Sequence, residues 1–295
     1  LIVIDSASSD GTGRMAKEFL TSSDLDSDRW RIINSLIPGK SRSINLATIS
    51  SKASHFIMMD ADSIVEPGWL DFFQRVFSDP EIGSASGIES IHIREGWRGQ
   101  YRTNSNRIRL MESRLGSTTV LEGGLIAWKS EITRSIPLVE ESNADDSQLA
   151  LSSIRLGYRS IVQEELSFFD SSMGNQIQRS IRRSQGLSRN LLRNWDLIFS
   201  ANGFQSRIAV FSSIATYVIF PWSYYFCLIS TIFHWRNTVS EEMAFYVPSF
   251  VIILSLLIPR GRSVLIGSTL SIISHIQFLF GRRYDEWVPS RGELS

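Results

Sequence analysis

Charged residues become scarce after residue 207 of this chain, and this change restricts its fold more than any other feature. The run from Ile208 to Phe233 contains no charged side chain and is long enough to cross a bilayer as a helix. Two shorter apolar runs follow, Met243 to Pro259 and Ser263 to Phe280, and each suits either a membrane span or a buried core helix. We therefore expect a membrane region of two or three spans between residues 208 and 281.

The segment ahead of this region, residues 174–207, is basic and partly amphipathic. Its arginines are accompanied by a single acid, Asp196. Basic residues flank membrane spans preferentially on the cytoplasmic side. The pattern predicts an integral protein of the cell membrane whose N-terminal part lies in the cytoplasm.

Net charge and cysteine content exclude other classes of protein. The formal net charge is zero, which argues against a partner bound through nucleic-acid phosphates. The single cysteine, Cys227, can form neither a disulfide nor a cysteine metal site within one chain. We expect no nucleic-acid partner.

Short apolar runs alternate with amphipathic stretches in the first part of the chain. Strands are predicted at residues 1–4, 30–33 and 56–59, with helices between them and a further helix opening at Pro67. This alternation is typical of an α/β fold with a mainly parallel sheet and helices on both faces. Ligands bind beyond the carboxyl ends of such strands, where Asp5 and Asp60 lie. Because Leu1 already opens a strand, we expect a longer natural chain.

Two acidic pairs are candidates for chemistry. Asp60 and Asp62 follow a strand and can hold a divalent cation and orient a diphosphate, although aspartates at strand ends also simply form turns. Asp145 and Asp146 open a helical stretch. One of them can act as a general base, or they can merely cap the helix.

Two groups of cations are candidates for phosphate binding. Lys40 and Arg42 follow Gly39, which permits close backbone approach, although the same residues suit a solvated loop. Arg182 and Arg183 can neutralise a departing diphosphate, or they can belong to the basic flank of the membrane region.

Taken in order, these pieces resemble the family-two glycosyltransferases with the GT-A fold, in the branch of the cellulose, hyaluronan and poly-N-acetylglucosamine synthases. The resemblance covers nearly the whole chain and rests on short motifs with a specific order. The matching segments are Ile4 to Thr12, Gly39 to Asn45, the DxD motif Asp60 to Asp62, Leu121 to Lys129, the acidic block Asp145 to Arg159, Gln178 to Gly186 and Trp287 to Arg291.

The resemblance implies a division of the chain and an activity. It places a GT-A catalytic domain at 1–173, an interface segment at 174–207, transmembrane helices at 208–281 and a tail at 282–295. It implies inverting transfer from a nucleotide-diphosphate sugar, such as a UDP-sugar, to a saccharide or lipid-linked acceptor in polysaccharide or glycoconjugate synthesis. It also implies a divalent metal, Mn²⁺ or Mg²⁺.

The resemblance further implies roles for individual residues. Asp146 is the expected base, Asp62 and Asp60 the metal ligands, and Asp5 a neighbour of the nucleotide base. The remaining expected substrate-binding residues are Lys40, Arg42, Gly124, Arg182 and Arg183.

The sequence also departs from the family pattern. The first strand of the family is absent, and Arg183 stands where the Q-x-x-R-W motif has tryptophan, which argues against processive synthesis. If all three apolar runs span, the C-terminus lies outside the cell, whereas the resemblance places Trp287 inside, near the active site. We therefore expect that one run, Met243 to Pro259, does not span.

Two alternatives remain at this point. A polyprenyl-phosphate glycosyltransferase shares the fold and the DxD motif but needs no strong base at Asp146. A non-catalytic membrane scaffold would use the apolar runs, but it leaves the ordered acidic motifs unexplained.

Overall fold

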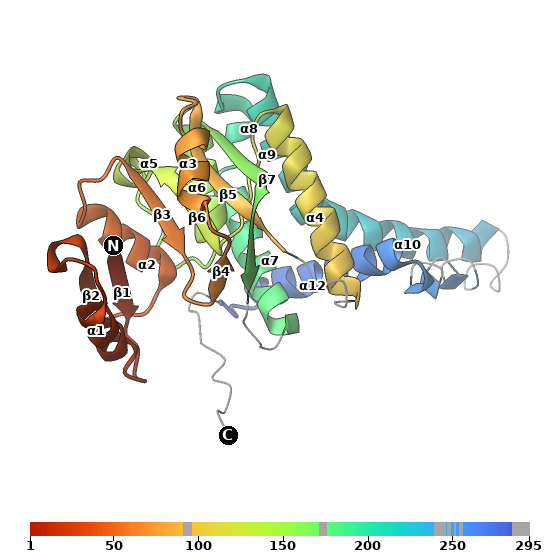
Figure 1. Ribbon diagram of the computed structural model, residues 1–295. Coiled ribbons are helices and arrows are strands. Elements are labelled where there is room, and N and C mark those ends of the chain that lie inside the picture. The colour runs from red at the N-terminus through yellow and green to blue at the C-terminus, as the bar shows by residue number, and fades with distance from the viewer. Residues whose placement is uncertain are drawn as a thin grey trace.

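The computed structural model describes residues 1–90, 96–170, 176–238, 246, 249–250, 252–253 and 256–284 (Figure 1). The strands are β1 (Ile2–Ser6), β2 (Arg31–Ser35), β3 (His55–Met59), β4 (Ser63–Val65), β5 (Ile82–Glu89), β6 (Leu125–Lys129) and β7 (Arg159–Asp170). The helices up to the acidic block are α1 (Thr12–Ser22), α2 (Lys40–Ile49), α3 (Trp69–Val76), α4 (Gly96–Leu115), α5 (Ser130–Ser135) and α6 (Asp145–Arg155). The later helices are α7 (Gln176–Arg193), α8 (Leu197–Ser200), α9 (Phe204–Ile214), the π-helix η2 (Ala215–Ile219), α10 (Phe220–Thr238) and α12 (Pro259–Leu279).

The strands form two sheets. β1 and β2 pair in parallel, and a separate five-stranded sheet has the order β3-β6-β5-β7-β4. The three strands predicted in the first sixty residues are all present, each within two residues of its expected bounds.

The prediction of a mainly parallel sheet is wrong. Among the described strands, β6 runs antiparallel to both of its neighbours and β4 runs antiparallel to β7, while β5 and β7 pair in parallel. Alternation of strands and helices implies parallel pairing only where successive strands lie side by side. In the larger sheet, neighbours in space are mostly distant in sequence, so the rule does not apply.

Helices cover both faces of the larger sheet, as predicted. Side chains alternate between the two faces of a strand. On β6, Leu125 and Ala127 pack in a cluster with Phe73 of α3, whereas Ile126 packs in another cluster with Leu149 of α6. Burying a large apolar side chain contributes about 1.5–3 kcal/mol, so this two-sided core fixes the sheet that carries the acidic motifs.

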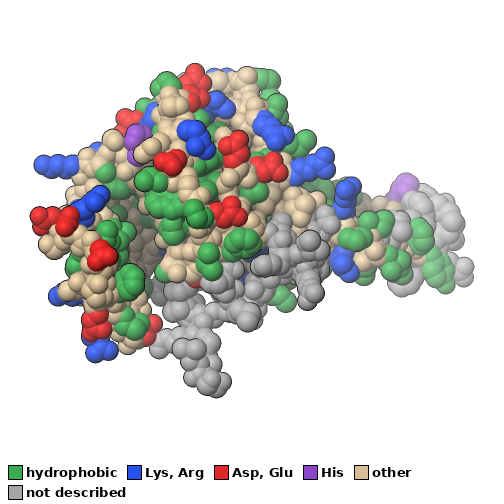
Figure 2. Space-filling model, viewed as in Figure 1, with side chains coloured by type: hydrophobic (Ala, Val, Ile, Leu, Met, Phe, Trp, Pro, Cys, Tyr) green, Lys and Arg blue, Asp and Glu red, His purple; other side chains and the backbone are tan. Residues whose placement is uncertain are grey.

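An apolar arm extends from the part of the molecule that contains the two sheets. α9, η2 and α10 follow one another without a break, and Phe204–Thr231 is 28 residues long and contains an 18-residue window with a mean hydropathy of 1.2. Only 11% of this window is buried, and among the described residues it is the one helix long and apolar enough to cross a bilayer. Hydrophobic side chains are prominent on the projecting helices in Figure 2.

α12 returns beside this arm and packs on α7. Tyr225 of α10 bonds Thr269 of α12 at 2.5 Å, and the ring of His275 bonds Ser188 of α7 at 2.8 Å. Both α10 and α12 extend away from the sheet in Figure 1. Almost half of the run from Met243 to Pro259, and all of Trp287 to Arg291, lie outside the described residues, so the expectations for them stay untested.

Candidate active site

The DxD motif forms the turn between β3 and β4. The Asp60 N–H donates to the carbonyl of Gly124 at 3.1 Å, and the Ser63 N–H donates back to the Asp60 carbonyl at 3.0 Å. These bonds fix the backbone of Asp60 against the start of β6, while the side chain of Asp62 is exposed to solvent. Asp60 and Asp62 can therefore form a turn and at the same time offer carboxylates to a ligand.

Gly124 has a packing role that the sequence did not suggest. A Cβ atom at this position would lie 2.2 Å from a ring carbon of Phe168 and 2.7 Å from the hydroxyl of Ser63. Only glycine allows β6 to begin this close to β7 and β4. The expectation that Gly124 binds substrate stays a prediction.

Lys40 joins segments that are far apart in the sequence. It is the first residue of α2, and its Nζ lies 2.7 Å from Asp60 Oδ1 and 3.3 Å from Asp145 Oδ2. It also donates to the carbonyl of Gly123 at 3.2 Å. The Gly39 N–H donates to Ser6 Oγ at 2.9 Å, which ties this helix start to the end of β1.

The charges around Lys40 shift the pKa values of the group. Burial of the ammonium lowers the pKa of Lys40, but the carboxylates of Asp145 and Asp60 outweigh this effect, so its pKa is raised above the ordinary value. Burial raises the pKa of Asp60, with Lys40 opposing the rise and Asp145 adding to it. Lys40 is therefore a permanent cation between two carboxyl groups.

Asp145 and Asp146 occupy different environments at the start of α6. Asp145 is buried, and its Oδ2 has no directed hydrogen bond although it lies within ion-pair distance of Lys40. Asp146 is half-buried, and its Oδ1 accepts a hydrogen bond of 2.6 Å from the Ser147 N–H. Ala144 occupies the N-cap position of the helix, and no side chain makes a capping hydrogen bond there. Neither aspartate is therefore the capping residue.

The pKa of Asp146 suits a general base at neutral pH. Burial, followed by the charge of Asp145, raises this pKa from 3.8 to about 6, while the Ser147 N–H, Lys40 and Arg109 lower it. A base is most effective when its pKa lies near the working pH. Asp146 is therefore ionised at neutral pH and is still able to take up a proton.

The predicted phosphate-binding arginines lie in different environments. Arg182 of α7 is half-buried, and burial together with the charges of Arg183 and Arg179 lowers its pKa to about 10, with Asp145 opposing. Arg183 is exposed. Arg42 forms an ion pair with Glu140 at 2.6 Å, so its guanidinium is already bound by an acidic side chain.

Asp5 lies on a separate part of the site. Its Oδ1 accepts from the Ser8 N–H at 3.1 Å, and its Oδ2 would lie 2.4 Å from a Cβ atom at Gly13. Glycine at this first turn of α1 therefore leaves room for the Asp5 carboxylate. The hydrogen bond between Ser6 and Gly39 holds this turn close to the start of α2. It does so with no direct bond between Asp5 and Lys40.

The carboxylates fit a hard divalent cation that is shared with a substrate. Among the described residues, no group of three or more His, Cys, Asp or Glu side chains is arranged to hold a metal. Mg²⁺ and similar ions commonly take one or two protein carboxylates and complete their shell with substrate phosphates and water. Asp60 and Asp62 supply oxygen ligands of the right type and number for this mode.

Sequence reasoning missed a buried ion pair behind the acidic block. Arg109 of α4 pairs with Glu122, and each side chain is 15% exposed. The Glu122 N–H donates to Ser86 Oγ at 3.0 Å, which fixes the loop that carries the Gly123 carbonyl. Arg109 belongs to no motif, and only the fold places its charge near Asp146.

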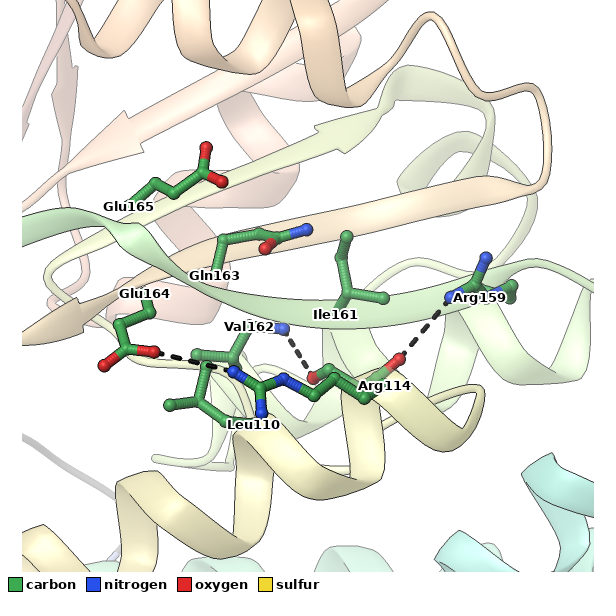
Figure 3. Close-up of a pocket in the computed structure, with 9 residues that line it drawn as sticks. Leu110, Arg114, Arg159, Ile161, Val162, Gln163, Glu164 and Glu165 are labelled. Atoms are coloured by element: carbon green, nitrogen blue, oxygen red, sulfur yellow. Dashed lines mark hydrogen bonds and ion pairs between the residues drawn. The ribbon is translucent and has the colours of Figure 1, made fainter.

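A surface cavity lies elsewhere on the larger sheet. It has a volume of about 360 Å³ between α4 and β7, and none of the predicted site residues lines it (Figure 3). Arg114 and Glu164 pair across it at 3.7 Å, and Arg159 donates to the Ser113 carbonyl at 3.4 Å at one end.

Comparison with known proteins agrees with the fold. Residues 1–134 match the family described as Glycosyl transferase family 2. The mannosyltransferase PcManGT from Pyrobaculum calidifontis, solved with GDP-Man and Mn²⁺, is 20% identical with a TM-score of 0.81, covering 96% of this chain and 78% of that one. S. aureus TarS 1–349, solved with UDP-GlcNAc, is 12% identical with a TM-score of 0.50, covering 96% and 83%. No curated protein matches the sequence.

At these identities the solved structures establish a shared architecture rather than a shared substrate. The family match covers the segment from β1 to α5, which contains Lys40, Asp60 and Asp62. Residues 1–134 therefore match glycosyl transferase family 2, and the chain shares its α/β fold with the solved mannosyltransferase.

Proposed function

We propose that this chain is a metal-dependent inverting glycosyltransferase that moves a sugar from a nucleotide-diphosphate sugar to a saccharide acceptor. The arrangement of Lys40 between Asp60 and Asp145, with Asp146 beside them, carries the proposal. It places a metal-binding motif, a fixed cation and a carboxylate of raised pKa at one end of the larger sheet. A family 2 domain and a fold shared with nucleotide-sugar enzymes support it.

On the donor side, acidic and basic groups have complementary tasks. Asp62 and Asp60 would hold Mn²⁺ or Mg²⁺, which supplies positive charge to the diphosphate when bound. Arg182 and Arg183, on the helix next to the acidic block, add positive charge for the leaving diphosphate. Asp5, at the end of β1, is the proposed neighbour of the nucleotide base.

On the acceptor side, Asp146 takes the proton. The acceptor hydroxyl attacks the anomeric carbon, the bond to the diphosphate breaks, and the hydroxyl proton passes to an oxygen of Asp146. A single displacement of this kind inverts the anomeric configuration. The raised pKa and partial exposure of Asp146 favour a hydroxyl acceptor over a polyprenyl phosphate, which is already ionised and needs no base.

The arm supports a location at a membrane. Its apolar face is largely unburied, and α12 lies beside α10, so the chain leaves the sheet along one helix and comes back along the other. The backbone of Tyr284, just after α12, is hydrogen-bonded to Asn143 and Gln185 of the catalytic part. We propose that the catalytic domain and Tyr284 share the cytoplasmic side, which agrees with a run from Met243 to Pro259 that does not span.

A donor screen tests the proposed function. The full chain, in membranes and in detergent, would be given a panel of UDP- and GDP-sugars with Mn²⁺ or Mg²⁺, and release of the nucleoside diphosphate would be measured. We expect metal-dependent turnover of at least one donor, lost in Asp146→Asn and retained in the exposed control Asp28→Asn. Absence of binding and turnover for every donor, with both metals, would contradict the proposal.

A further inference from the structure

The side chain of Asn143 connects the acidic block to two other parts of the chain. Asn143 lies two residues before Asp145, and its Nδ2 donates to the carbonyl of Tyr284 at 2.7 Å and to that of Arg182 at 3.3 Å. A Cβ atom at Gly186 would lie 2.0 Å from Asn143 Oδ1. The amide therefore needs a glycine on α7 in order to reach both carbonyls.

Gln185 holds the other side of the same segment. It is 2% exposed, its Nε2 donates to the carbonyls of Ser274 at 3.3 Å and Arg282 at 3.0 Å, and its Oε1 accepts from the Tyr284 N–H at 3.0 Å. The two backbone polar groups of Tyr284 are thus bound by two different amide side chains. Such a pair of bonds fixes both the position and the direction of the chain after α12.

The start of α6 depends on its preceding loop for its orientation. No side chain caps this helix, and the loop is held on one side by the Ser41 hydroxyl, which donates to the Ser142 carbonyl at 3.1 Å. Asn143 provides the hold on the other side. Without the hydrogen bonds of Asn143, the loop before Asp145 and Asp146 would keep only the bond from Ser41 of these two attachments.

We infer that Asn143 is a positioning residue for the acidic pair, and that the return of α12 to Tyr284 is a structural part of the proposed active site. The inference rests on the proposed function, because it concerns the placement of the proposed base Asp146. It assigns α12 and the residues that follow it a role in the proposed active site. The segment from Gly281 to Tyr284 supports the loop from which the base projects.

Three variants of the full chain test this role. Asn143→Asp keeps the size of the side chain but replaces the donor with an acceptor that faces two carbonyls. Asn143→Ala removes the contact, and Gly186→Ala pushes the amide away while leaving Asn143 in place. Misplacing a reacting group by about 1 Å can cost roughly a hundredfold in rate, so we expect turnover to fall by about 10- to 100-fold.

The expected pattern separates positioning from general stability. Affinity for a nucleoside diphosphate with Mn²⁺ should change little, and the acidic limb of the pH–rate profile should shift because the surroundings of Asp146 change. In Asn143→Ala the space for a methyl group at Gly186 becomes available, so the double variant should be no worse than Asn143→Ala alone. The control is the exposed Thr103→Ala, which loses a bond of 2.8 Å to the Gly99 carbonyl within α4 and should keep wild-type turnover.

Backbone hydrogen exchange gives a reading that does not depend on activity. We expect faster exchange at residues 142–147 in Asn143→Ala and in Gly186→Ala, without a matching change in β6. Unchanged exchange at these residues would overturn the inference, as would wild-type turnover in the Asn143 variants of an active enzyme. An inactive wild-type chain with the expected exchange pattern would instead count against the proposed function.

Discussion

Replacement of Asp146 by asparagine should abolish most turnover and, at the same time, make the folded protein more stable at neutral pH. Burial and the charge of Asp145 raise the pKa of Asp146 from 3.8 to about 6, so the fold disfavours the ionised carboxylate that catalysis requires. Asparagine has no charge to desolvate, and its carbonyl oxygen can still accept the bond from the Ser147 N–H. The proposed base is thus kept at a cost in stability.

The size of the effect follows from the shift in pKa. A rise of about two units corresponds to ~3 kcal/mol between the two protonation states, which is an upper limit for the gain in the variant. Because the native pKa is raised, the wild-type chain regains this stability as the pH falls from about 6 to 3.8. The advantage of Asp146→Asn should be full above pH 7 and should vanish near pH 4.

Thermal unfolding from pH 4 to 8 measures this advantage, and transfer assays on the same samples measure turnover. General-base assistance is worth about 10²- to 10⁴-fold, so turnover should fall by that order while nucleotide affinity is retained. The exposed control Asp28→Asn should leave both quantities unchanged. An Asp146→Asn protein that is less stable than wild type at pH 8, or equally stable at every pH, would refute the reasoning.

Other changes have distinct expected results. Asp62→Ala should abolish divalent-dependent binding of a nucleoside diphosphate, and unchanged metal dependence in a titration would remove Asp62 from the metal site. Lys40→Met leaves Asp60 and Asp145 without their shared cation. It should lower the free energy of unfolding by about 1–3 kcal/mol at neutral pH, a figure already reduced because the pair is partly exposed. The loss should be smaller near pH 4, because Asp60 then takes up a proton. Denaturation at both pH values measures this, and an equal loss at each would contradict it. The full chain should leave membranes with detergent but not with salt alone, so its release by salt would contradict membrane insertion.

The local elements of the first part of the chain could be predicted because their signals are local. The apolar run at residues 56–59 and the acids after it are adjacent in sequence, and they form β3 and its turn. The pairing of strands could not be predicted in the same way. β6 joins β3 through residues separated by a long stretch of chain, so no periodicity in either strand records the antiparallel direction.

The candidate site shows the same division. The motifs identified Lys40, Asp60 and the acidic block separately. The ion pair between Lys40 and Asp145 joins residues more than a hundred positions apart, so it follows only from the fold. The sequence left open whether Asp145 merely caps the helix, whereas the structure pairs it with Lys40. Asn143 carries no motif, and its importance depends on a glycine in α7 that lies against it.

The anomeric configuration of the transferred sugar tests the central claim most directly. NMR of the product formed from a donor of known configuration, taken before any anomeric equilibration, distinguishes the two stereochemical courses. A single displacement assisted by Asp146 predicts inversion, for example a β-linked product from an α-linked donor. Retention of configuration would contradict the account, because it requires either a second displacement or a front-face reaction in which Asp146 does not act as the base.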